Sequence, residues 1–222
     1  MAPALPDHVA AQLRGFGPLG LLAAAVVLLG NGLFAPLSAV LAIAWAWLSR
    51  TPFQELGFRR PRSWLTLVAA GIALGVLLRL LMKAVVMPLL GAEPVNPQYG
   101  HLAGNAAALP AIIVAIVAGS GFGEETIYRG FLFERLGKLF GAGRGAAALI
   151  ILLTSSWFAA VHYPVQGMMG VAQAMLLGLV LGCLQARTRQ LWLCMVIHAS
   201  FNLAAVALIY WRLEERIAGL FF

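Results

Sequence analysis

Gly123-Glu124-Glu125-Thr126-Ile127-Tyr128-Arg129-Gly130 places two adjacent carboxylates and a guanidinium inside an otherwise apolar sequence. Residues 109–121 carry no charge, and Phe131-Leu132-Phe133 resumes the apolar pattern. Burying a carboxylate in hydrocarbon costs several kcal/mol unless the group is paired or protonated. Glu125 and Arg129 are one helical turn apart in the favourable order, so a structural ion pair accounts for both. Glu124 has no such partner and is the first candidate for a functional residue.

The composition predicts a membrane protein. The chain has 222 residues, of which 62% are hydrophobic and 10% are charged, and its mean hydropathy is +0.90. A soluble domain carries roughly 25% charged residues. We therefore expect an all-α, polytopic, integral membrane helical bundle with about six transmembrane helices of ~20 residues each. The whole chain, 1–222, would form a single membrane-embedded domain.

Six apolar segments follow one another along the chain. The first, 19–48, is broken by Gly30-Asn31-Gly32 and Pro36, which predicts one long kinked span or a short re-entrant piece followed by a span. The other expected spans are 64–90, 106–139, 146–162, 168–186 and 191–211, and an amphipathic tail follows. The segment Met1–Arg14 carries Asp7 and little positive charge, so we do not interpret it as a signal peptide.

The net charge of +7 comes from arginines gathered in a few loops, a pattern that orients a membrane protein and contacts anionic headgroups. We expect a lipid bilayer as partner and no nucleic acid. The basic loops are 50–62, 134–144 and 187–189, whereas 91–104 and 163–167 carry no Lys or Arg. The basic set should be cytoplasmic. Glu124 and His162 then fall in the half of the membrane away from the cytoplasm, and His198 falls near its middle.

Arg79 and Lys83 are unexpected within the 64–90 span. They lie four residues apart on one helical face, and Arg79 is near the middle of the span. One interpretation is an ion pair with Glu124 or Glu125 inside the bundle. The other is a positive site for a substrate carboxylate or a lipid headgroup.

Three further polar side chains lie at membrane depth, namely His162, His198 and Asn202. A lone histidine on an apolar helix is more often a packing or hydrogen-bonding residue than a catalyst. Here, however, two histidines, an asparagine and an unpaired glutamate fall on three different spans. Such a set suits water activation, because a desolvated carboxylate can act as a general base, while Asn and His can donate hydrogen bonds to an oxyanion.

A metal site is the alternative chemistry. Glu124, His162 and His198 match a catalytic zinc set with an open fourth position. The His-Glu-x-x-His zinc helix is absent, however. We expect no required cofactor, with a divalent metal such as zinc as the alternative.

The motifs Glu124-Glu125-x-x-x-Arg129, Phe158-x-x-x-His162 and His198-x-x-x-Asn202, on successive spans, resemble the CAAX-protease and bacteriocin-processing family, also called CPBP or Abi. This family of intramembrane endopeptidases includes the Rce1-type CAAX prenyl proteases. The resemblance covers roughly residues 50–210.

The resemblance implies that Glu124 is the general base on water, that His162 assists it, and that His198 and Asn202 hold the oxyanion. Glu125 and Arg129 would form a supporting pair. It implies a glutamate-dependent intramembrane endopeptidase whose partner is a membrane-anchored protein or peptide, in a multi-pass protein of the bacterial inner membrane. Prenyl-protein processing is cytoplasmic, whereas the charge count places this site on the other side, so we expect a different substrate.

Two other functions fit the same residues. A non-enzymatic membrane scaffold or immunity protein would use the buried polar set for binding specificity, and a small transporter would use it as an ion path. The absence of an obvious repeat counts against the transporter. The sequence does not define the oligomeric state.

Overall fold

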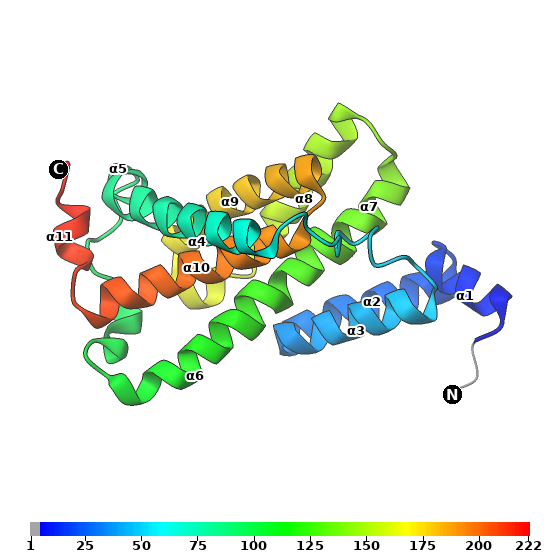
Figure 1. The fold of residues 1–222 in the computed structure, drawn as a ribbon, viewed down its shortest axis with the longest axis horizontal. Coiled ribbons are helices and arrows are strands. Elements are labelled where there is room, and N and C mark those ends of the chain that lie inside the picture. Colours follow the sequence, from blue (N-terminus) through cyan, green and yellow to red (C-terminus); the bar gives the residue numbers. More distant parts are fainter. Residues whose placement is uncertain (1–4) are drawn as a thin grey trace.

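The structure is a computed structural model that describes residues 5–222; the first four residues of the Met1–Arg14 segment lie outside the described part. All regular elements within residues 5–222 are helical (Figure 1), which confirms the predicted all-α class. The elements are α1 (Asp7–Arg14), α2 (Pro18–Leu33), α3 (Ala35–Leu48), α4 (Trp64–Leu81), η1 (Met82–Val86), α5 (Met87–Leu89), η2 (Pro97–Leu102), η3 (Ala106–Ala108), α6 (Leu109–Val114), η4 (Ala115–Glu124), η5 (Thr126–Phe131), α7 (Leu132–Phe140), α8 (Arg144–Ala160), α9 (Tyr163–Thr188), α10 (Leu191–Tyr210) and α11 (Glu214–Ala218).

Four continuous helical segments of residues 5–222 are long and apolar enough to cross a membrane. They are Trp64–Leu89, Ala106–Phe140, Tyr163–Thr188 and Leu191–Tyr210. The pair α1 and α2, bent by 60°, adds a fifth candidate, and α3 and α8 are shorter apolar helices. The expectation of about six membrane helices is compatible with this set, and the chain is a polytopic membrane bundle.

The apolar run 19–48 folds as a helical hairpin, which differs from a single kinked span. Phe34 adopts an extended conformation between α2 and α3, and Pro36 lies in the first turn of α3, where its missing N–H costs nothing. The two helices run side by side (Figure 1), and the Ser38 hydroxyl donates a hydrogen bond to the carbonyl of Val27. The break therefore turns the chain back on itself.

Glycine allows the closest helix contacts of the bundle. A Cβ placed on Gly75 of α4 would lie 2.5 Å from the carbonyl oxygen of Ile197 in α10. A Cβ on Gly178 of α9 would lie 3.0 Å from the Cβ of Ser155 in α8. Small residues at helix crossings let backbones approach and gain van der Waals contact, which drives association where water is absent.

The loops that connect the helices lie at two opposite ends of the bundle (Figure 1). The α7–α8 and α9–α10 connections and the start of α4 lie toward one end, whereas α5 and α11 lie toward the other. The first end carries the arginine-rich loops. The site described below lies deeper, where the double glutamate meets α8, α9 and α10.

Candidate active site

The double glutamate lies in one long helical segment, Ala106–Phe140, close to the predicted 106–139. Two stretches of it, η4 and η5, are wound as π-helix and meet at Glu125. π-helical turns are rare and occur frequently at functional sites, because the wider turn re-aims side chains. A Cβ on Gly123 would lie 3.0 Å from the backbone of Ala35, so the helix passes very close to α3 here.

Glu125 joins Arg129 to His198. Its Oε1 receives Nη1 of Arg129 at 2.9 Å and lies 2.7 Å from Nδ1 of His198 in α10. The second Arg129 nitrogen, Nη2, donates to the carbonyl of Gly178 in α9 at 3.2 Å. All three side chains are buried, so the ion pair predicted from the one-turn spacing is present and also fixes α10 and α9 around the π-helix.

The contact with Glu125 sets the tautomer of His198. A carboxylate paired with Arg129 only accepts hydrogen bonds, so the Nδ1 of His198 carries a proton and donates. The other nitrogen, Nε2, then faces Oε2 of Glu124 at 3.8 Å. This separation is too long for a direct hydrogen bond and leaves the two atoms able to share a bound molecule.

Glu124 faces a cavity of about 270 Å³. Its Oε2 is buried and has no hydrogen-bond partner within residues 5–222. The cavity also receives His162, His198 and Asn202, so the structure brings all four residues of the predicted catalytic set to one space. The other polar side chains lining it are Arg79, Asn96, Tyr99, Ser120, Gln166 and Gln173. Asn96, Tyr99 and Gln166 come from or adjoin the loops that lack Lys and Arg.

His162 lies just before α9, and the carbonyl of Phe158 fixes its ring. Nδ1 of His162 lies 2.7 Å from that oxygen, which can only accept, so Nδ1 carries the proton and Nε2 is an acceptor in the neutral ring. The Phe158 ring is 4.7 Å from His162 and 5.7 Å from His198, edge to face in both cases. The Arg129 guanidinium lies 4.7 Å from the centre of the same ring. Phe158 thus contacts both imidazoles, His162 through its carbonyl and its ring and His198 through its ring.

The predicted ion pair of Arg79 or Lys83 with Glu124 or Glu125 is wrong. Lys83 Nζ instead pairs with Glu214 Oε1 of α11 at 3.0 Å, and both side chains are buried. Arg79 Nη1 donates to Gln173 Oε1 at 3.0 Å, and its guanidinium lies over the Phe201 ring. The physical reason is that α11 packs against η1, which carries Lys83, and so brings the Glu214 carboxylate to the ammonium.

Sequence reasoning missed a second cavity beside Glu124. This space of about 330 Å³ is lined by Glu124 and His162 together with Asn31 and Tyr128. Asn31 Nδ2 donates to the Tyr128 hydroxyl at 2.9 Å. Asn31 is the only polar side chain of α2, and a polar group within a membrane helix indicates function by default. That rule could have identified Asn31, which the sequence analysis treated only as part of a helix break.

The residues do not assemble a metal site. Among residues 5–222, no three His, Cys, Asp or Glu side chains gather in a way that could hold a metal ion. Protein acceptors engage Nδ1 of His162 and Nδ1 of His198, so in both rings Nε2 is the nitrogen left to face the cavity.

The fold and the site define a class: a polytopic helical membrane protein with a buried Glu–Arg–His network beside a glutamate whose Oε2 has no hydrogen-bond partner within residues 5–222. Comparison with protein families narrows this class to one family. The family model described as type II CAAX prenyl endopeptidase Rce1-like matches residues 106–204, a little under half of the chain. This segment is similar to the Rce1-like family, as its motifs predicted, and the similarity points to a peptidase of the CAAX type that acts in the membrane. Searches of curated proteins and of solved structures gave no match.

Proposed function

We propose that the chain is an intramembrane endopeptidase in which Glu124 activates water for hydrolysis of a peptide bond. The observation that carries the proposal is the position of Oε2 of Glu124. This buried carboxylate oxygen has no hydrogen-bond partner within residues 5–222, faces a cavity, and lies 3.8 Å from Nε2 of His198. A general base needs a free lone pair within reach of the water that it deprotonates.

In the proposed reaction, Glu124 takes a proton from water and the resulting hydroxide attacks the carbonyl carbon of the substrate. The tetrahedral intermediate then breaks its C–N bond, and the proton held by Glu124 passes to the leaving amine. His162 assists by accepting a hydrogen bond from the water at Nε2, because its Nδ1 proton is committed to the carbonyl of Phe158. Atoms and charge balance without any further reactant.

Asn202 and His198 would stabilise the oxyanion. The amide Nδ2 of Asn202 is a donor in any protonation state. His198 has Nδ1 committed to Glu125, so Nε2 donates to the oxyanion only when the ring carries both protons. Glu125 therefore does more than pair with Arg129. Its carboxylate also holds the His198 imidazole in place and would balance the positive charge of the doubly protonated ring. Removing one oxyanion donor typically costs about 10²–10³ in kcat.

The proposed substrate is a membrane-anchored protein or peptide that enters from the end without basic loops. Asn96, Tyr99 and Gln166 line the cavity at that end, and the basic loops lie at the other. Arg79, held by Gln173, is the cation of this cavity and offers a site for a substrate carboxylate or carbonyl. A multi-pass location in a bacterial inner membrane belongs to this proposal, and so does a reaction that needs no cofactor.

The test compares the peptide ends found in host membranes by mass spectrometry. One membrane sample carries the wild-type chain, a second carries Glu124→Gln, and a third carries Glu215→Gln, the same substitution on the exposed face of α11. New peptide ends should appear with the wild type and Glu215→Gln but not with Glu124→Gln at matched expression. They would identify the substrate and the cleavage site together.

Equal peptide profiles for the wild type and Glu124→Gln would overturn the proposal. If Glu124→Gln then still supports the host phenotype of the wild type, the buried polar set serves binding, as in the scaffold alternative. Ion flux through liposomes that depends on Glu124 would favour the transporter instead.

A further inference from the structure

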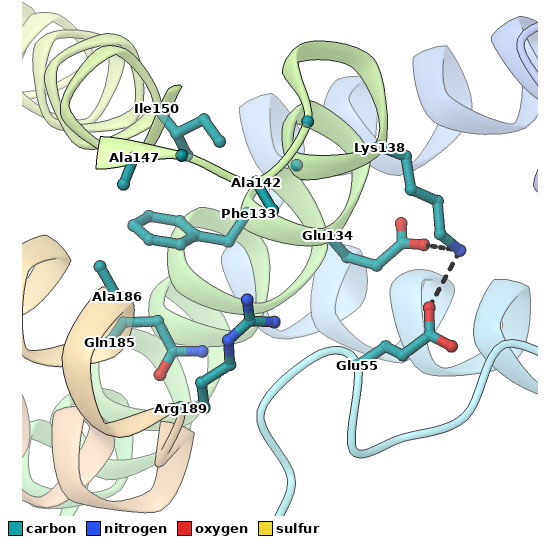
Figure 2. Close-up of a pocket in the computed structure, with 13 residues that line it drawn as sticks. Glu55, Phe133, Glu134, Lys138, Ala142, Ala147, Ile150, Gln185, Ala186 and Arg189 are labelled. Carbon is teal, nitrogen blue, oxygen red and sulfur yellow. Dashed lines mark ion pairs between the residues drawn. The ribbon is translucent and has the colours of Figure 1, made fainter. Parts of the chain in front are cut away.

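A further cavity lies away from Glu124. It measures about 390 Å³ and lies at the end of the bundle that carries the arginine-rich loops. Its walls come from α7, the start of α8, the end of α9 and the loop before α4 (Figure 2). This volume is in the range of small-molecule sites, roughly 300–1,000 Å³. None of the residues of the proposed catalytic set lines it.

One side of this cavity presents unused hydrogen-bond acceptors. Glu134 and Gln185 are both more than nine-tenths buried, and Glu134 Oε2 and Gln185 Oε1 have no hydrogen-bond partner within residues 5–222. The closest cation to Glu134 Oε2 is Nη1 of Arg135 at 3.6 Å, and that nitrogen donates to the carbonyl of Arg14. A buried acceptor without a donor costs free energy, so two such groups at one cavity indicate a ligand that supplies donors.

The acidic side also carries a fixed ion-pair bridge. Lys138 reaches Glu55 at 3.0 Å and contacts Glu134 as well (Figure 2). The bridge leaves a second oxygen on each carboxylate. Arg135 also lies 3.6 Å from Glu134 Oε2, so Lys138 and Arg135 together balance the two carboxylates, and this wall offers hydrogen-bond acceptors rather than net negative charge.

The opposite side presents positive charge without a partner. Arg189, directly after α9, makes no ion pair or side-chain hydrogen bond within the described residues and extends toward the cavity (Figure 2). The N-terminus of the 17-residue helix α8 also reaches the cavity at Gly143, which caps it without a side chain. The first N–H groups of a helix are open donors and favour an anion, and guanidinium groups bind phosphate well.

We infer that this cavity binds the phosphoethanolamine headgroup of a membrane phospholipid. The phosphate would lie against Arg189 and the start of α8, and the primary ammonium would donate to Glu134, Gln185 and Glu55. Phe133, Ala147 and Ile150 form an apolar wall on which the glycerol and the first acyl carbons can lie. The loops that surround the cavity are the basic ones, which lie at headgroup level in a membrane protein.

The inference does not depend on the proposed peptidase. Its test uses the purified full chain in detergent, supplied with phosphatidylethanolamine, phosphatidylcholine or phosphatidylglycerol of identical acyl chains, and native mass spectrometry counts the lipid retained. Phosphatidylcholine keeps both charges but has no N–H donor. Phosphatidylglycerol keeps the phosphate but has no ammonium. We expect at least about tenfold tighter retention of phosphatidylethanolamine than of either, since both other lipids lack the charged hydrogen bonds of the primary ammonium.

Single-residue variants test whether the lipid is retained at this cavity. Arg189→Gln should weaken retention of phosphatidylethanolamine about tenfold. Arg187→Gln, an exposed arginine of the same helix end that does not line the cavity, is the matched control and should retain the wild-type affinity. Gln185→Leu should reduce the preference for phosphatidylethanolamine over phosphatidylcholine while leaving the chain folded, because it removes an acceptor that lacks a partner.

Three outcomes would overturn the inference. Equal retention of phosphatidylethanolamine and phosphatidylcholine would show that no ammonium donor is recognised. An equal loss in Arg187→Gln and Arg189→Gln would show general surface attraction. Displacement of the lipid by inorganic phosphate and by phosphoethanolamine at the same concentration would show a free phosphate site without headgroup recognition.

Discussion

Nδ1 of His198 lies 2.7 Å from Oε1 of Glu125, the same oxygen that receives Nη1 of Arg129. One carboxylate oxygen thus holds a cation from its own helix and an imidazole from α10. Glu125 is separated from His198 by 73 positions in the sequence, so this single atom ties the two motifs together. A substitution of Glu125 therefore changes both the ion pair with Arg129 and the position of the His198 imidazole.

The first prediction separates the charge of Glu125 from its role as acceptor. Glu125→Gln should lower the free energy of unfolding by about 3–5 kcal/mol, because it leaves Arg129 buried without a counter-ion. The double change Glu125→Leu with Arg129→Met removes both charges and should recover most of that loss. Peptide cleavage should stay lost in the double variant, because Nδ1 of His198 has no acceptor. Unfolding in detergent micelles, followed by circular dichroism, measures the stability, and recovery of cleavage in the double variant would contradict the role given to Glu125.

Glu124 should show the opposite effect on stability. Its Oε2 is buried without a partner, so Glu124→Gln removes a charge that the fold does not compensate. We expect the free energy of unfolding to rise by about 0.5–2 kcal/mol while cleavage is abolished, the usual exchange between stability and activity at a functional site. The same unfolding experiment on Glu215→Gln, an exposed glutamate, should show a change within about 0.5 kcal/mol. A large destabilisation by Glu124→Gln would assign this glutamate a structural role.

The sequence predicted the parts of the site that depend on local spacing. The Glu125–Arg129 pair follows from a separation of one helical turn, and His198 and Asn202 share a cavity because four residues on a helix face the same way. The π-helix was not predictable, since hydrophobic periodicity does not distinguish i→i+4 from i→i+5 bonding over a short apolar stretch. The catalytic roles of these residues stay predictions.

Long-range pairs were not accessible from one sequence. Lys83 and Glu214 are 131 positions apart, and nothing in either segment indicates the other. Asn31 and Tyr128 are 97 positions apart, and Asn31 lies outside the segment that matches the family. In both cases the contact depends on how a terminal element, α11 or the α2–α3 hairpin, docks on the bundle.

His162 supplies the third prediction. Its Nε2 is the acceptor that the proposed mechanism uses, because Nδ1 is bound to the carbonyl of Phe158. His162→Ala should lower kcat about 10²–10⁴-fold, the range for loss of a general acid–base group, with a smaller effect on KM. His101→Ala is the matched control, since His101 is exposed and does not line the cavity. A rise in KM with unchanged kcat would instead assign His162 to substrate binding.

The hydrogen bond between Asn31 and Tyr128 leads to the fourth prediction. Asn31→Leu and Tyr128→Phe each remove one partner, and the two changes together should cost less than the sum of the single changes. The coupling should be about 0.5–1.5 kcal/mol in the free energy of unfolding, the net value of a hydrogen bond. Additive losses would contradict the contact. Tyr128 lines the same cavity as Glu124, so we further expect Tyr128→Phe to slow cleavage, whereas Tyr163→Phe, at an exposed tyrosine, should not.

The fifth prediction tests whether α11 is part of the membrane domain. Lys83 and Glu214 are both buried, with Nζ and Oε1 3.0 Å apart, so Glu214→Gln should lower the free energy of unfolding by about 3–5 kcal/mol. Glu215→Gln changes the neighbouring exposed carboxylate and should stay within about 0.5 kcal/mol of the wild type. Lys83→Met with Glu214→Leu keeps the packing volume and removes both charges, so stability should return. Equal stability of Glu214→Gln and Glu215→Gln would contradict the contribution of the Lys83–Glu214 pair.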